Sequence, residues 1–77
     1  MKQQDVTEED LVVLAKRFRK QSGIRRAQAA RDMEVSQTSI FHAEESPAKG
    51  LTRLRVKMIE KYSPYRVKGP VFFLEKK

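Results

Sequence analysis

Residues 36–43, SQTSIFHA, form a stretch whose polar side chains carry no formal charge. Gln37 has an amide, Thr38 has a hydroxyl next to a methyl group, and His42 has an imidazole. On a helix these groups share one side, because residues three or four positions apart are neighbours. Amides, hydroxyls and imidazoles donate and accept hydrogen bonds, and they match the polar edges of nucleic-acid bases. The chemistry that this stretch predicts is therefore recognition of base edges.

The same chain lacks the residue combinations that catalysis or metal binding requires. It has no cysteine and a single histidine, His42, so we expect no disulfide, no zinc site and no metal. The acidic cluster from Asp5 to Asp10 is interpreted as charge at a helix start rather than as a catalytic carboxylate group. No nucleophile–base pair and no glycine-rich phosphate loop is present in the sequence. We expect a protein without catalytic residues or cofactors, not an enzyme.

The positive charge is concentrated in the last part of the chain. The formal net charge is +7, from 17 Lys and Arg against 10 Asp and Glu. Residues 1–22 sum to +1 and residues 23–46 to −1, whereas residues 47–77 carry nine positive and two negative side chains. A basic surface of this kind suits a polyanion, either a nucleic acid or an anionic membrane.

The length of 77 residues predicts one small domain, 1–77. A core of this size supplies only about 3–5 kcal/mol, and without disulfides or metals a partner subunit is the remaining source of stability. We therefore expect a homodimer. The longest apolar run, residues 71–74, is far shorter than the ~20 residues that span a bilayer. We expect no membrane insertion and a cytoplasmic, nucleoid-associated location.

The first predicted helix covers residues 8–21. Thr7 is a good N-cap, and three acidic residues follow it in the first turn, where they face the positive end of the helix dipole. An apolar face repeats at helical spacing and contains Leu11, Leu14, Ala15 and Phe18. Gly23 is suited to end this helix.

Two short helices are predicted next, at residues 26–33 and 37–44. Ser36 is suited to cap the second, Ile40 and Ala43 are its expected core residues, and Ser46-Pro47 ends it. The turn between the two helices has three to four residues, which is the spacing of a helix-turn-helix.

A fourth helix is predicted at residues 51–62, followed by strand structure over residues 65–75. Leu51, Leu54, Met58 and Tyr62 lie on one face of that helix. The sequence does not show on which face Arg55 lies. The tail is rich in β-branched and aromatic residues around a Gly-Pro break, as is typical of an edge strand or hairpin.

From Gly23 to Ser46 the chain resembles the helix-turn-helix of the phage-repressor and Cro type, also called XRE-type. Ala30 is in the small position of the first helix, Ile40 and Ala43 are in core positions of the second, and Glu44 matches a frequent acidic residue. The family's leading glutamine is replaced by Arg26. Its turn glycine is replaced by Glu34, at a position that often needs positive φ. The resemblance implies a mainly α, four-helix lambda-repressor-like helix-turn-helix domain with a short C-terminal β-strand or hairpin.

The resemblance also implies roles for individual residues. The expected contacts to DNA bases are made by Gln37, Thr38, Phe41 and His42. The expected contacts to DNA phosphates are made by Arg26, Ser36, Ser39, Lys49, Arg53 and Lys57. Two alternatives stay open: His42 as an ordinary surface histidine, and Phe41 as a core or dimer contact.

The last predicted feature is the role of the apolar C-terminal tail. Val71, Phe72, Phe73 and Leu74 are the predicted dimer interface, formed by pairing the C-terminal strands of two subunits. The expected function is a sequence-specific transcriptional regulator, a repressor that binds double-stranded DNA as a dimer at a palindromic operator with its third helix in the major groove. The alternatives are an antitoxin-like module whose tail binds a protein partner, and salt-sensitive binding to nucleic acid without sequence preference.

Overall fold

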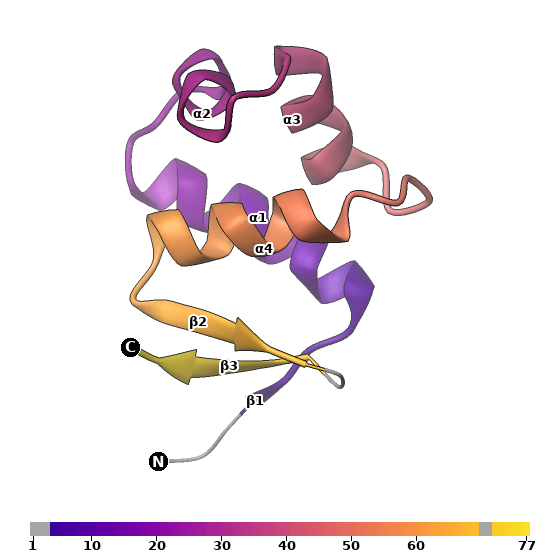
Figure 1. Cartoon of the computed structure of the whole chain (residues 1–77), viewed down its shortest axis with the longest axis vertical. Helices are drawn as coiled ribbons and strands as arrows, with labels where there is room; N and C mark the ends of the chain where they lie inside the picture. Colours follow the sequence, from indigo (N-terminus) through magenta and orange to yellow (C-terminus); the bar gives the residue numbers. More distant parts are fainter. Residues whose placement is uncertain (1–3, 70–71) are drawn as a thin grey trace.

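The computed structural model describes residues 4–69 and 72–77. Its elements, in chain order, are β1 (Gln4–Asp5), α1 (Glu8–Gln21), α2 (Arg26–Met33), α3 (Gln37–Glu45), α4 (Thr52–Tyr62), β2 (Tyr65–Lys68) and β3 (Phe73–Lys76). Helices α1 and α4 pack side by side in the middle of the molecule, with α2 and α3 at one end and the three strands at the other (Figure 1). The predicted mainly α class is confirmed.

The observed elements differ from the predicted ranges at four places. Helices α1 and α2 have the expected bounds, whereas α3 continues one residue further and α4 begins one residue later. The tail predicted as strand over 65–75 is divided into β2 and β3, which form an antiparallel hairpin. Strand β1 was not predicted. None of the helices in the described part of the chain combines the length and apolar character needed to cross a membrane.

Side-chain caps fix the starts of α1 and α3. The Thr7 hydroxyl accepts a hydrogen bond from the Asp10 N–H at 3.1 Å, and the Asp10 carboxylate accepts one from the Thr7 N–H at 2.9 Å. This reciprocal pair is a capping box. At α3 the Ser36 hydroxyl accepts from the Ser39 N–H at 3.1 Å. Both caps satisfy backbone donors that the first turn of a helix leaves without partners.

The turn between α2 and α3 depends on one residue in the left-handed region. Glu34 has φ 58° and ψ 45°, and it is the one non-glycine residue with positive φ in the described chain. The Val35 N–H then donates to the Ala30 carbonyl at 3.0 Å, which closes the end of α2. The sequence resemblance predicted a positive φ at this position, where the phage-repressor pattern has a glycine.

Replacement of Glu34 by glycine is expected to stabilise the protein by about 0.5–1 kcal/mol. An L-residue in this region loses about 1–2 kcal/mol to contact between Cβ and the carbonyl oxygen, and the greater flexibility of unfolded glycine offsets part of that gain. Urea unfolding followed by circular dichroism measures the change. Glu34→Ala removes the same exposed carboxylate but keeps Cβ, so it should give no such gain. Equal stability of the two variants would contradict this account of the turn.

The core lies where the four helices meet. Its fully buried side chains come from every helix and are Leu11, Ala15, Ala29, Ile40, Ala43, Met58 and Ile59. The sheet covers this core from the other side through Leu74, with Tyr65, Val67 and Phe72 packed beside it. Helix α3 therefore has a fixed inner face, formed by Ile40 and Ala43.

Strand β3 is the middle strand of the sheet, in the order β1-β3-β2. Leu74 is opposite Val67 of β2 on one side and Gln4 of β1 on the other. The backbone donors on the far edge of β2 are occupied, because the Tyr65 N–H donates to the Ser63 hydroxyl at 3.1 Å and the Val67 N–H to the Glu60 carboxylate at 3.0 Å. The C-terminal strand thus pairs within the chain.

Pairing within the chain uses residues that were predicted to form the dimer interface. Leu74 is only 8% exposed and belongs to the core, and Phe72 also packs against the core. Phe73 is half-buried and is not among the side chains that contact the core, whereas Val71 lies outside the described residues. Pairing of C-terminal strands between subunits would require displacement of β1 or of the side chains that occupy the β2 edge. Dimerisation through this segment stays a prediction.

Candidate nucleic-acid interface

The outer face of α3 carries the residues that the sequence singled out. Gln37 and Thr38 are exposed, and the Phe41 side chain is 45% exposed. His42 is half-buried, and its Nδ1 lies 3.1 Å from the Ser46 hydroxyl. Because the opposite face of α3 is held in the core, these four residues share the side of the helix that faces solvent. The Gln37 amide and the Thr38 hydroxyl are available to a ligand without unfolding, whereas the His42 Nδ1 already has the Ser46 hydroxyl as a partner.

Two serines lie at the start of α3. The Ser36 and Ser39 hydroxyls are 3.1 Å apart, and Ser36 caps the helix. The start of a helix has unpaired backbone donors and the positive end of the helix dipole, and both favour an anion such as a phosphate. The two serines are therefore placed where a phosphate contact is possible.

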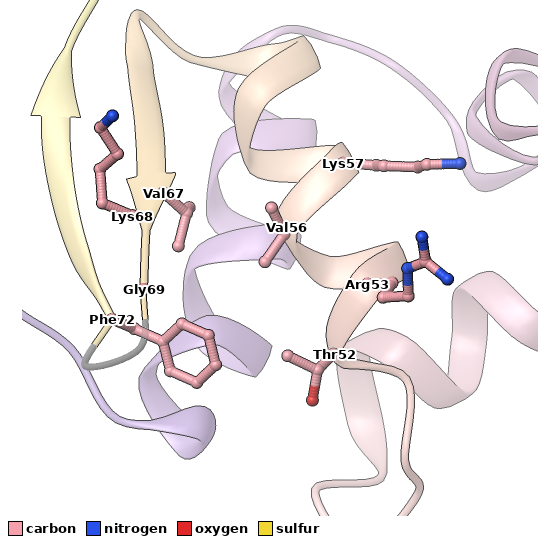
Figure 2. Close-up of a pocket in the computed structure, with 8 residues that line it drawn as sticks. All are labelled: Thr52, Arg53, Val56, Lys57, Val67, Lys68, Gly69 and Phe72. Atoms are coloured by element: carbon pink, nitrogen blue, oxygen red, sulfur yellow. The ribbon is translucent and has the colours of Figure 1, made fainter.

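Lys49, Arg53 and Lys57 follow α3 and are exposed. Lys49 is in the loop before α4, and Arg53 and Lys57 are one turn apart on α4. The side chains of Arg53 and Lys57 extend from the side of α4 opposite to Val67 of the sheet (Figure 2). Among the described residues, no carboxylate forms an ion pair with any of these three cations. They are free to contact a polyanion.

Arg26 is placed differently from the other predicted phosphate contacts. Its Nε donates to the Glu44 carboxylate at 3.0 Å and its Nη2 to the Glu45 carboxylate at 2.9 Å. Its guanidinium also lies over the Phe41 ring, 5.2 Å from the centroid. Cation–π contacts of this kind favour a fixed ring position. Arg26 therefore holds Phe41 on the outer face of α3, and a phosphate would compete with two carboxylates for it.

A buried ion pair between α1 and α3 lies behind this surface. Arg19 donates to both carboxylate oxygens of Glu44, from Nε and, at 2.9 Å, from Nη2. The Arg19 Nη1 donates to the Ile24 carbonyl at 2.7 Å. The Glu44 side chain is fully buried and that of Arg19 is 9% exposed. This bidentate pair fixes both the position and the rotation of α3.

The ion pairs continue to the surface through Glu45. Its carboxylate accepts from the Lys16 ammonium at 2.5 Å and from Arg26. The hydrogen bond from Lys16 is the main reason why the pKa of Glu45 lies below its usual value, and the charge of Arg26 acts in the same direction. Helices α1, α2 and α3 are thus joined by one continuous set of ion pairs.

Arg55 forms hydrogen bonds with the C-terminal end of α3. Its guanidinium is buried, with Nε donating to the Ala43 carbonyl and Nη2 to the Ser46 carbonyl, both at 2.9 Å. These carbonyls belong to the last turn of α3 and to its C-cap, where the helix itself provides no donors. Burial lowers the pKa of Arg55 from its usual high value. Arg55 therefore supports α3 from inside and is not part of the exposed basic surface.

A hydrogen bond between α2 and α4 also holds α2 in place. The Tyr62 hydroxyl donates to the Asp32 carboxylate at 2.6 Å. This bond, with a second one from Gln28, lowers the pKa of Asp32, whereas burial and the nearby carboxylate raise the pKa of Tyr62. Helix α2 is therefore attached to α4 as well as to α3.

No group of three or more potential metal ligands occurs among residues 4–69 and 72–77. Comparison of the chain with protein-family models, with curated proteins and with solved structures gives no match. The geometry of α2, α3 and the exposed cations that follow them in the chain is therefore what indicates a function.

Proposed function

We propose that this protein is a sequence-specific regulator of transcription that binds double-stranded DNA, with α2 and α3 as a helix-turn-helix in a lambda-repressor-like domain. The observation that carries the proposal is the outer face of α3, which exposes uncharged hydrogen-bonding side chains. Exposed cations follow in the α3–α4 loop and in α4, and they have no acidic partner among the described residues. Base edges are read by such uncharged groups, whereas phosphates are contacted by cations and helix starts.

In the proposed complex, α3 enters the major groove. Gln37 reaches an adenine edge with its amide, and the Thr38 methyl packs on a thymine methyl. Phe41, positioned by Arg26, contacts a methyl group or a sugar. Ser36 and Ser39 contact one phosphate at the start of α3, and the cations of α4 contact the adjacent backbone. Sequence preference and affinity thus arise from different residues.

The proposal includes two chains on one operator. A helix of about two turns contacts only a few base pairs, and two symmetry-related copies double that number. The half-sites of a palindromic operator would lie about 34 Å apart, one turn of DNA. Occupation of a promoter by such a dimer represses transcription by excluding the polymerase.

Fluorescence anisotropy tests this proposal directly. A labelled duplex from the region upstream of the protein's own gene and a scrambled duplex of the same composition are titrated at physiological salt. The proposal predicts tight binding to the upstream duplex with two chains per site, and weak binding to the scrambled one. Equal, weak and salt-sensitive binding to both would overturn sequence-specific recognition.

Replacement of Gln37 by alanine is expected to weaken binding to the specific duplex by about 1–3 kcal/mol and to change binding to scrambled DNA little, because the amide reads a base. Gln21→Ala, at an exposed glutamine in the last turn of α1, is the matched control and should leave both affinities unchanged. Arg53→Ala should instead weaken both complexes alike and reduce the salt slope by about 1. An equal loss on both duplexes for Gln37→Ala would remove this residue from base recognition.

A further inference from the structure

The Phe41 side chain is an apolar group on a helix face that is otherwise polar. It is 45% exposed, although burial of an aromatic ring is strongly favourable. Around the axis of α3, at about 100° per residue, Phe41 lies between Gln37 and Thr38. The ring therefore belongs to the face that is proposed to read bases, and its exposure suits a ligand that presents an apolar group to this face.

Contacts from two neighbouring side chains hold this ring in the free protein. The Arg26 guanidinium lies 5.2 Å from the ring centroid, and the His42 ring meets it edge to face with 5.6 Å between centroids. Arg26 is itself held by the carboxylates of Glu44 and Glu45, at 3.0 and 2.9 Å. The Glu44 side chain is fully buried, so the support of the ring extends into the core. A side chain that is ordered in advance loses little conformational freedom on binding, which favours affinity.

We propose that Arg26 is a positioning residue rather than a phosphate contact, and that it holds Phe41 against the C5-methyl group of a thymine. This inference rests on the proposed function, because it requires α3 to lie in the major groove. In that groove the methyl group of thymine is the apolar group that the bases present. Two carboxylates already partner the Arg26 guanidinium, so phosphate contact is left to the cations that have no such partners.

Replacement of thymine by uracil tests the methyl contact, because uracil forms the same base pair and lacks only the methyl group. The thymines of the upstream duplex are replaced one at a time, and binding is followed by fluorescence anisotropy. At one position in a half-site the unmodified chain should bind about fourfold more weakly, which is the factor that burial of one methyl group contributes. Phe41→Ala should show no loss at that position. Uracil losses that are the same for both chains at every position would overturn the proposal.

Arg26→Gln tests the positioning role, and Arg25→Gln is its matched control. Arg25 is an exposed neighbour that has no ion pair among the described residues, so both variants lose one positive charge at the start of α2. Arg26→Gln should remove most of the uracil loss and leave the salt slope of DNA binding unchanged, whereas Arg25→Gln should keep the uracil loss. A salt slope that falls by about 1 in Arg26→Gln would assign Arg26 to a phosphate and overturn the positioning role.

The order of the ring is measured without DNA, from the three-bond NMR couplings that report χ1 of Phe41. The free chain should show one staggered rotamer, and Arg26→Gln should show averaged couplings. Thermal unfolding of the variant establishes that it is folded. Averaged couplings in the unmodified chain would overturn the positioning role. Specific DNA binding that ignores every uracil replacement would overturn the methyl contact alone, whereas absence of specific binding would overturn it together with the proposed function.

Discussion

The chain with Glu44 replaced by alanine is expected to lose most of its stability and to be only marginally folded at room temperature. Removal of this carboxylate leaves the buried Arg19 guanidinium without its charge partner and takes one of two partners from Arg26. Breaking a buried ion pair by removing one side costs about 3–5 kcal/mol. A small domain has a total stability on the order of 5 kcal/mol, so a loss of this size removes most of it.

Urea unfolding followed by circular dichroism measures this effect. Glu45→Ala is the matched control, because this neighbouring glutamate is 33% exposed and exposed ion pairs contribute little to stability. The double replacement of Arg19 by methionine and Glu44 by leucine should recover much of the loss, because an apolar pair of similar volume often substitutes for a buried ion pair. Similar stability of Glu44→Ala and Glu45→Ala would contradict the role assigned to the buried pair.

Replacement of Arg55 by methionine is expected to destabilise the protein by about 1–3 kcal/mol and to weaken the proposed DNA binding, although Arg55 itself would not contact DNA. Methionine keeps the apolar stem of the side chain but cannot donate to the Ala43 and Ser46 carbonyls. The buried Ala43 carbonyl is then left without a donor, which costs about 1–3 kcal/mol, whereas the Ser46 carbonyl keeps the hydrogen bond from the Lys49 N–H at 3.0 Å. The end of α3 should then become mobile, which hydrogen exchange of the amides of α3 measures.

Arg53→Met separates this supporting role from phosphate contact. Arg53 is exposed two residues earlier on the same helix, so its replacement should change the stability by less than about 0.5 kcal/mol while it reduces the salt dependence of DNA binding. Arg55→Met should show the opposite pattern, with reduced stability and an unchanged salt slope. The prediction fails if both variants are equally stable, or if Arg55→Met alone lowers the salt slope.

The sequence predicts the helices well because their signals are local. Thr7 and Ser36 start helices with side-chain caps, and Pro47 and Pro64 follow the ends of α3 and α4. Strand β1 has no such signal. It consists of two residues whose pairing with β3 spans almost the whole chain, so no periodicity within that segment indicates a strand.

The sequence pattern also does not reveal which arginines are buried. Near the end of the first helix, Arg19 is indistinguishable from the neighbouring cations that favour the helix dipole. The pattern also leaves the orientation of Arg55 open, because helix rotation decides which face is covered. Both arginines are buried since each meets acceptors on another helix, the Glu44 carboxylate or the α3 carbonyls. Such pairs arise from tertiary packing, so spacing along the chain does not reveal them.

Arg26 is a predicted site residue whose tertiary partners the sequence likewise did not reveal. Its position at the start of a helix is compatible with a phosphate contact, and the residue type agrees. The structure adds two carboxylates and an aromatic ring around its guanidinium. The residues proposed to read bases are easier to place, because an exposed face follows once Ile40 and Ala43 are assigned to the core.

The central place of β3 in the sheet has a consequence for synthesis on the ribosome. β1 and β2 are made before β3, yet neither has a strand partner until β3 has left the exit tunnel. The four helices, which contact one another directly, can assemble earlier. A chain that lacks β3 should therefore contain a helical core with an incomplete sheet, and the edges of β1 and β2 would stay open to chaperones.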